Sequence, residues 1–441
     1  FSEDVIGVGA ADFIAIGVTG TSISVTQVTA STYDVTVSGG DMANFNGTMA
    51  LNLNSPTITD LAGNALPNTE PSTDELYTLD NTNPTVTGVS STFGHGSYKE
   101  GVNIFIVVNF SEDVTVTGTP QIELETGTID QTVNYTGGSG TTKLTFTYVV
   151  QSGDVNTDLD YTSTTALILN GGTIKDAVGN AATLTLAAPG ATNSLGANKD
   201  LTIDTTAPVF SAVNPNSSSK VNSANVGYTL SESITSGTVI FTRTDGTADG
   251  SSPHTINLTG TELNAGTRAS AALTNAPTLI DGAIYTVSFD GTDAAGNTAT
   301  TVNSTTVTYD TTTPTVLEVT SDKANGTYSV GESINIYVQY TEEVFVTGTP
   351  QLTLETGTTD RTINYADRSV STLRFVYTVQ SGDESADLDV TSSSALTLNS
   401  GTIKDAAGNN ASLTVQHGAT SGSLSLNKNI VINASVPTVT T

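Results

Sequence analysis

The chain has 441 residues, no cysteine, and a net charge of −30 from 13 basic and 43 acidic side chains. Nucleic acid and anionic membrane surfaces are excluded as partners, because phosphate groups are bound by clustered Lys and Arg. The lack of cysteine excludes disulfide frameworks and thiolate metal sites. No apolar run approaches the roughly 20 residues of a membrane helix, so we expect no direct membrane insertion.

The first predicted domain, residues 1–82, opens with FSEDV and ends in TITDLAGNALPNTEPSTDELYTLDNTNP. The same FSEDV recurs at 110–114, where the strand-like NIFIVVNF precedes it. We therefore expect an Ig-like domain whose first strands lie outside this sequence. Two explanations stay open: a piece of a longer array, or strands supplied by a neighbouring copy through strand addition.

The second predicted domain, 83–206, and the fourth, 313–436, are copies of each other. VTGTPQIELETGTIDQTVNY from Val116 aligns with VTGTPQLTLETGTTDRTINY from Val346, and GTIKDAVGN aligns with GTIKDAAGN. Between them lies a divergent domain, 207–312. Residues 437–441 resemble the start of a next repeat. Such internal repetition predicts a tandem array.

Every unit shows short segments rich in β-branched and aromatic residues, such as KLTFTYVV and LRFVYTV. They largely alternate apolar and polar positions and are separated by Gly, Asn, Asp and Ser clusters. No helical period is sustained. The sequence predicts an all-β fold of tandem immunoglobulin-like Greek-key β-sandwiches in an extended rod.

Acidic and amide residues recur at three kinds of position: an acidic phrase after an early strand, a D-x-A/V-G-N turn, and the linker before a Pro. In chain order, the candidate metal ligands are Glu3, Asp60, Asn64, Asp80, Glu100, Glu112, Asp176, Asn180, Asp204, Glu232, Asp293, Asn297, Asp310, Glu332, Glu342, Asp405, Asn409 and Asn433. Asn433 stands where the other linkers carry Asp.

We expect the acidic phrase and the turn to share the C-terminal end of each unit with the linker that follows, as with Asp204. Carboxylates gathered there would repel one another. Ca²⁺ takes six to eight oxygen ligands and resolves this, so we predict Ca²⁺ at the interdomain junctions. Two alternatives stay open: Asp and Asn simply cap the turn, and the glutamates are solvated charges.

Two further patterns are weaker. Asp154, Asn156, Asp158 and Asp160 alternate as in a calcium loop, and Asp383, Asp387 and Asp389 repeat part of this, but one solvated strand face explains both. Lys175 and Lys404 recur in GTIKDA, where an exposed lysine at a strand end is simpler than an intramolecular crosslink.

The phrases FSEDV, VTGTPQIELETG, GTIKDAVGNAATLTL and IDTTAP resemble bacterial Ig-like repeats of large cell-surface adhesins and motility surface proteins. The resemblance implies an Ig-type sandwich, a tandem arrangement, an extracellular location on a bacterial surface and, often, calcium at the junctions. The junction is similar to that of cadherins in architecture only, since the cadherin motifs are absent. The third unit departs from this pattern, since it lacks the VTGTP and DLD phrases.

We expect the chain to be a structural stalk segment of a bacterial surface adhesin, with neighbouring Ig-like domains of the same long chain as its partners. Catalysis is not expected, because His95, His254 and His417 fall in no repeated motif and no G-x-S-x-G elbow occurs. Two alternatives are a filament or surface layer assembled from copies of the chain by strand exchange, and a glycan-binding module.

Overall fold

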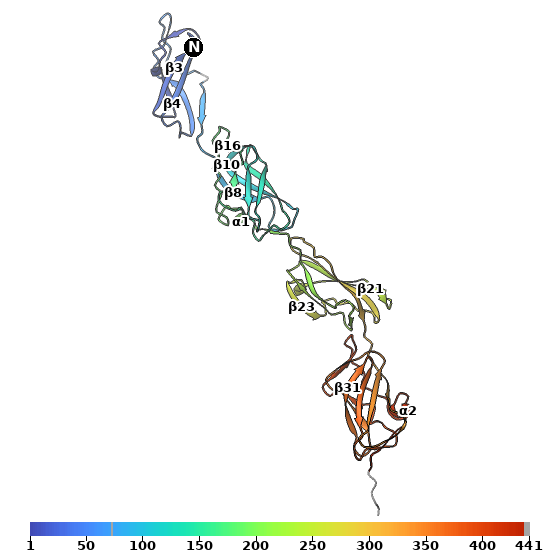
Figure 1. Cartoon of the computed structure of the whole chain (residues 1–441). Helices are drawn as coiled ribbons and strands as arrows, with labels where there is room; N and C mark the ends of the chain where they lie inside the picture. The colour runs from blue at the N-terminus through green and yellow to red at the C-terminus, as the bar shows by residue number, and fades with distance from the viewer. Residues whose placement is uncertain (72–73, 436–441) are drawn as a thin grey trace, which may run out of the picture. The chain divides into compact units, whose positions relative to one another are not determined.

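A computed structural model describes residues 1–71 and 74–435, and the chain divides into two compact units, Phe1–Thr206 and Ala207–Thr441. Strands make up most of the regular structure (Figure 1). The predicted start of a next repeat, 437–441, lies outside the described residues, as does residue 436. In the part of the chain that the structure describes, no helix could span a membrane.

The described residues of the first predicted domain form three small sheets. Strand β5 pairs with β2 and with β7, β3 and β4 form a hairpin, and β1 pairs with β6. The elements are β1 (Val5–Ile6), η1 (Ala10–Asp12), β2 (Phe13–Ile16), β3 (Thr21–Gln27), β4 (Tyr33–Gly39), β5 (Gly47–Leu53), β6 (Thr59–Asp60) and β7 (Leu76–Leu79).

The second predicted domain has a seven-stranded sheet and a three-stranded sheet. The large sheet runs β15-β11-β12-β13-β10-β16, with β8 on β10, and the small one runs β14-β17-β9. The elements are β8 (Val86–Ser91), β9 (Gly96–Tyr98), β10 (Asn103–Thr117), β11 (Gln121–Leu124), β12 (Gln131–Gly137), β13 (Thr141–Val149), β14 (Val155–Asn156), β15 (Leu167–Ile168), β16 (Thr173–Lys175), α1 (Leu195–Asn198) and β17 (Leu201–Asp204).

The third predicted domain shows the Ig arrangement most directly. Strands β18-β20-β23 form one sheet and β19-β25-β24-β21-β22 the other. Strands β18, β20 and β23 occupy the A, B and E positions of a Greek-key sandwich, and strands β21, β24 and β25 occupy the C, F and G positions. The elements are β18 (Phe210–Asn214), β19 (Lys220–Val221), β20 (Val226–Leu230), β21 (Ser236–Gly246), β22 (His254–Asn257), η2 (Gly260–Leu263), β23 (Gly266–Ala271), β24 (Ala283–Thr292) and β25 (Val302–Tyr309).

The fourth predicted domain repeats the strand order of the second: β26-β28-β32-β31-β30 matches β8-β10-β13-β12-β11. The elements are β26 (Val316–Ser321), β27 (Gly326–Tyr328), β28 (Ser333–Tyr340), β29 (Phe345–Thr347), β30 (Gln351–Glu355), β31 (Arg361–Ser369), β32 (Thr372–Thr378), β33 (Glu384–Ser385), β34 (Asp389–Val390), β35 (Leu396–Thr397), β36 (Thr402–Lys404), α2 (Leu424–Asn427) and β37 (Ile430–Asn433).

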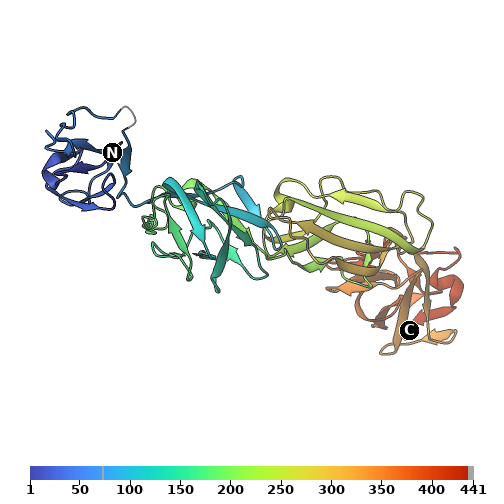
Figure 2. The ribbon, with the colours of Figure 1, turned by 90° about the horizontal axis from the view of Figure 1, so that it is seen from above.

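Three apolar cores lie within residues 89–203, 210–307 and 316–434. Each core is built from alternate residues of paired strands, as β28 shows: Ile334, Ile336 and Val338 are fully buried while the residues between them are not. The alternation follows from the two-residue period of a strand. The prediction of an all-β fold of tandem β-sandwiches is confirmed, and Figure 2 gives a second view of the same strands.

Candidate metal sites

The four D-x-A/V-G-N turns close in the same way. In the second predicted domain, Asp176 Oδ1 accepts the backbone N–H of Asn180 at 2.8 Å, and Asp176 Oδ2 accepts the Asn180 side-chain amide at 2.6 Å. Gly179 takes φ +109°, a left-handed value that favours glycine. The hydrogen bonds expected of a turn cap are therefore present. The same side-chain pairing recurs at Asp60–Asn64, Asp293–Asn297 and Asp405–Asn409.

The FSEDV phrase at 110–114 contains an irregularity in β10. Up to Asn109 the strand pairs in register with β13; the register shifts before Val114, and from Thr115 the strand pairs with β16. A bulge re-aims the side chains beside it. Because β16 leads directly into the turn at Asp176, Glu112 is carried toward that turn.

Glu112 and Asp176 meet a third carboxylate, Asp80, which follows β7 in the linker before the second predicted domain. One oxygen from each of the three lies within 4.8 Å of the other two. Asn180 fixes the linker: its side-chain amide also donates to the Asp80 backbone carbonyl at 2.9 Å. We call Asp80, Glu112 and Asp176 the first acidic cluster.

Charge in the first acidic cluster is uncompensated by protein cations. No salt bridge reaches its three carboxylates within the described residues. Burial, together with the charges of Asp80 and Asp176, raises the pKa of Glu112. Burial alone would raise the pKa of Asp176 too, but hydrogen bonds from Asn180 and the N–H groups of Gly179 and Val178 hold it below its usual value.

Asp310, Glu342 and Asp405 repeat this arrangement before and within the fourth predicted domain, and we call them the second acidic cluster. One oxygen from each lies within 4.8 Å of the others, and Asp310 and Asp405 are buried. The Asn409 side-chain amide donates to the Asp310 carbonyl at 2.8 Å, as Asn180 does to Asp80.

The second acidic cluster differs from the first in one respect: Lys220 Nζ lies 3.2 Å from Asp310 Oδ2. Burial and the charges of Asp310 and Asp405 raise the pKa of Glu342, while Lys220 lowers it. The recurring phrases gave no sign of Lys220, because it lies in the divergent domain and contacts Asp310 only through the tertiary structure.

The two clusters offer a hard, all-oxygen donor set. Ca²⁺ binds oxygens at 2.3–2.6 Å, so ligands of one ion lie up to about 5 Å apart, and separations below 4.8 Å fit this. No Cys or His belongs to either group, which disfavours softer transition metals. Asp80, Glu112 and Asp176, and likewise Asp310, Glu342 and Asp405, could hold such an ion.

The grouping differs from our expectation in one way. We expected Glu112 and Asp176 to share an end with Asp204, the linker acid that follows their own domain. They instead meet Asp80, from the linker that precedes it. Asp204 ends β17, pairs with Val155 and accepts the Thr206 N–H at 3.0 Å. The reason is topological: β16 returns the D-x-A/V-G-N turn to the end where the domain's first strand enters.

Two other predicted pairs are brought together. Glu232 and Asp293 have carboxylate oxygens within 4.8 Å of each other. Glu3 and Asp60 line one groove of the first predicted domain, with Asn64 beside them.

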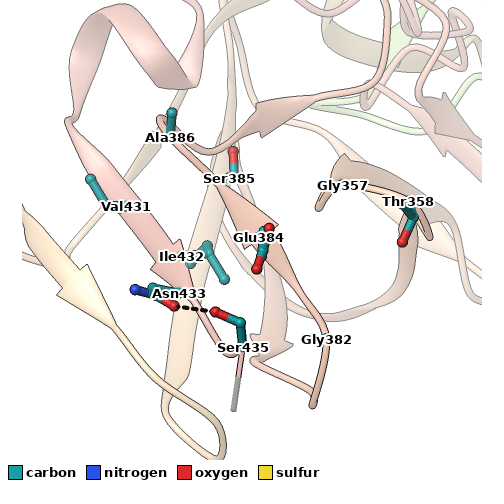
Figure 3. A pocket seen from close by; sticks show the side chains of 10 residues that line it. All are labelled: Gly357, Thr358, Gly382, Glu384, Ser385, Ala386, Val431, Ile432, Asn433 and Ser435. Carbon is teal, nitrogen blue, oxygen red and sulfur yellow. Dashed lines mark hydrogen bonds between the residues drawn. The ribbon is translucent and has the colours of Figure 1, made fainter. Parts of the chain in front are cut away.

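The structure places other predicted ligands elsewhere. Glu332 caps its own turn, accepting the Ser329 N–H at 2.7 Å, and neither it nor its counterpart Glu100 belongs to an acidic group of three in the described part of the chain. Asn433 pairs in β37 with Glu384 and accepts a hydrogen bond from Ser435 at 2.9 Å, along an open groove (Figure 3).

Two of the alternating acids in each copy are buried, contrary to our interpretation of the pattern as one solvated strand face, whereas Asp158 and Asp387 are exposed. Asp154 is 3% exposed and accepts hydrogen bonds from the Tyr148 hydroxyl and the Gln131 amide. Asp160 is also buried and accepts the N–H of Leu195. Both carboxylates are hydrogen-bonded structural groups. In the fourth predicted domain Asp383 and Asp389 are buried in the same way.

Comparisons with known proteins assign no family. No protein-family model and no curated protein matches the chain. Among solved structures, the I-band fragment I67–I69 of titin is similar at 10% identity and a TM-score of 0.26, over 80% of this chain and 99% of the fragment. A protein described as membrane anchored, from Corynebacterium diphtheriae, is similar at 10% identity and a TM-score of 0.16, over 79% and 91% of the two chains. Scores this low carry no argument about function.

Proposed function

We propose that this chain is a stalk segment of a bacterial cell-surface adhesin, stiffened by Ca²⁺ at junctions between its domains. The observation that carries the proposal is the recurrence of one arrangement at two junctions. In both, a linker Asp, a Glu from the acidic phrase and the turn Asp converge, and the turn Asn holds the linker carbonyl.

The proposed mechanism is mechanical. Without a cation, the gathered carboxylates repel one another and favour states in which the linker moves away. A bound Ca²⁺ replaces this repulsion with attraction to all three groups, so the linker is held against the domain that follows it. Repeated along the chain, such junctions would produce an extended rod.

The chemistry of the ligands suits the extracellular side of a cell. Extracellular calcium-binding modules have dissociation constants of about 10⁻⁴–10⁻³ M for Ca²⁺. Such sites are filled outside the cell and would be empty in the cytoplasm. The negative charge of the chain favours cations over nucleic acid or anionic membranes. We propose neighbouring Ig-like domains of the same surface protein as the partners, and a structural rather than a catalytic role.

Calcium titration of the whole chain tests the proposal. After treatment with EDTA, calorimetry should detect binding near millimolar Ca²⁺, and small-angle scattering should show a larger maximum dimension with Ca²⁺ than without it. The double variant Glu112→Gln, Glu342→Gln should lose the calcium binding of the two clusters and reduce the change in maximum dimension.

A matched control carries the same chemical change outside the clusters: Glu100→Gln with Glu332→Gln. It should bind Ca²⁺ as the unaltered chain does. Absence of calcium binding at 10 mM, or equal loss in the control, would overturn the assignment of these clusters. An unchanged maximum dimension despite binding would overturn the stiffening alone.

A further inference from the structure

The linker between the third and fourth predicted domains is hydrogen-bonded to the third domain at three consecutive residues. Asp281, just before β24, accepts the Thr311 N–H at 2.6 Å and the Thr311 hydroxyl at 2.9 Å. Its second oxygen accepts the Thr312 hydroxyl at 3.2 Å. The Asp310 N–H donates to the carbonyl of Val221, which ends β19, at 2.9 Å. This part of the linker is therefore attached to the third domain.

The next residues of the linker are attached to the fourth domain. The Pro314 carbonyl accepts the Ser412 N–H at 2.8 Å, and the Thr341 N–H donates to the Thr315 carbonyl at 2.9 Å. Thr313 alone separates the two attached segments. A residue before proline is restricted to extended conformations, and the proline ring fixes its own φ. The backbone between the two domains therefore has little freedom.

A side-chain contact also joins the two domains directly. The Asn222 amide, which follows β19, donates to Asn409 Oδ1 at 3.1 Å. The Asn409 amide nitrogen donates in turn to the Asp310 carbonyl and to Asp405 Oδ2, both at 2.8 Å. Asn409 of the fourth domain thus contacts the third domain with its oxygen and the linker with its nitrogen.

Repulsion within the second acidic cluster acts against these contacts. Lys220 Nζ lies 3.2 Å from Asp310 Oδ2 and offsets part of the charge. Each hydrogen bond alone contributes only modestly to stability. However, a change of angle at Thr313 breaks the bonds that Asn409 makes to Asn222 and the linker, and a change nearer the third domain breaks those of Asp281. Every route to a new angle therefore breaks more than one bond.

We infer that the third and fourth predicted domains keep one relative orientation in the absence of Ca²⁺, and that Asn222 and Asp281 hold it. An ion bound at the second acidic cluster then strengthens a junction whose angle is already fixed. The statement about the bound ion rests on the proposed calcium site, whereas the statement about the ion-free chain rests on the protein contacts alone.

The test measures distances between spin labels in the whole chain. The chain has no cysteine, so two introduced cysteines are labelled uniquely. Thr255→Cys on β22 and Thr327→Cys on β27 are at exposed positions of the third and fourth domains. Pulsed electron paramagnetic resonance in EDTA should give one narrow distance distribution, and saturating Ca²⁺ should leave its mean and width unchanged. A reference pair within the fourth domain, Thr327→Cys with Thr362→Cys, gives the width due to the labels themselves.

A double variant tests the residues that hold the angle. Asn222→Ala with Asp281→Ala should lose the single narrow distance in EDTA and regain it with Ca²⁺. The matched control is Asn264→Ala with Asp290→Ala, since Asp290 also accepts a threonine hydroxyl, but from Thr301 of its own domain. The control should keep the narrow distance in EDTA. Loss of the narrow distance in the control as well would overturn the roles of Asn222 and Asp281.

The unaltered chain decides the inference even if the double variant does not fold. A broad distribution in EDTA that narrows with Ca²⁺ would overturn the inference and leave the proposed calcium stiffening intact. A narrow distribution in EDTA, in a chain that calorimetry shows not to bind Ca²⁺, would support the inference for the ion-free chain and overturn the proposed function instead.

Discussion

The side-chain amide of Asn180 donates a hydrogen bond to the backbone carbonyl of Asp80, although 100 residues separate them in the sequence. Asn409 makes the same bond to Asp310 across 99 residues. A turn in one predicted domain thus holds the linker that leads into that domain. The bond needs no ion, so it opposes the repulsion between the carboxylates of the cluster in the ion-free chain.

Asn180→Ala should destabilise the second predicted domain by about 1–2 kcal/mol, since it removes the bond to Asp80 and leaves polar groups unpaired. It should also accelerate hydrogen exchange of the Thr82 amide, which is bonded to Asp80 Oδ1. Asn64→Ala is the matched control, because Asn64 closes the same turn on Asp60. Unchanged exchange at Thr82 in Asn180→Ala would show that the turn does not hold the linker.

The raised pKa of Glu112 predicts how pH acts on the ion-free chain. A carboxyl with a higher pKa in the folded state binds its proton more tightly there, so its ionisation lowers stability as pH rises through that pKa. Glu112→Gln removes the penalty. In EDTA, the variant should gain stability over the unaltered chain as pH is raised from 4 to 7.

Thermal unfolding at several pH values measures this difference, and Glu100→Gln serves as the control outside the cluster. With saturating Ca²⁺ the order should reverse, because the variant loses a ligand. Saturation at a hundred times the dissociation constant stabilises a site by about 2.7 kcal/mol. A difference that does not vary with pH would contradict the repulsion on which this prediction rests.

Lys220→Met should strengthen calcium binding at the second acidic cluster and lower the stability of the calcium-free chain. Lys220 offsets part of the charge of Asp310, and a cation must compete with it. Since Lys220 is half exposed, the expected change is about 0.5–1 kcal/mol, or a few-fold in affinity. Calorimetric titration should show a lower dissociation constant for Ca²⁺ at the second acidic cluster and an unchanged one at the first acidic cluster. Weaker binding in the variant would mean that Lys220 supports the site.

Asp383→Asn should lower the free energy of unfolding of the fourth predicted domain by about 2 kcal/mol or more. The reason is that Asp383 is buried and accepts hydrogen bonds from Tyr377 and Arg361. Burial alone would raise the pKa of Asp383, but these bonds and the Gln380 N–H hold it below its usual value. The contribution is therefore present at neutral pH and lost as pH falls through that pKa.

Arg361→Gln is the matched comparison for this network, since Gln131 makes the equivalent bond to Asp154 in the second domain. Arg361→Gln should lower the free energy of unfolding, measured with a chemical denaturant at pH 7, by less than Asp383→Asn does. An equal or larger loss would assign the stability to the ion pair rather than to the buried carboxylate.

Local sequence determined much of the fold. Alternating apolar residues in β28 or β13 predict strands because the side-chain period of a strand is two residues. The D-x-A/V-G-N turns are predictable for a similar reason: Asp, Gly and Asn close the loop through bonds spanning four residues. The recurrence of Glu112 at Glu342 also follows from the repeat alone.

Partners distant in the sequence required the tertiary structure. Which linker meets Glu112 and Asp176 depends on where β16 returns in the sheet, and no local pattern reports that. The same holds for the burial of Asp154, which an alternating strand pattern makes look solvated, and for the contact of Lys220 with Asp310.

The sequence by itself determined the strands, the turns and the repeating set of carboxylates, because those depend on neighbouring residues. Only the tertiary structure decided that Asp80, rather than Asp204, joins Glu112 and Asp176, and that Glu100 and Glu332 stay outside the clusters. The physical reason is that sheet pairing, set by the packing of distant strands, selects the end of the sandwich at which each charge lies.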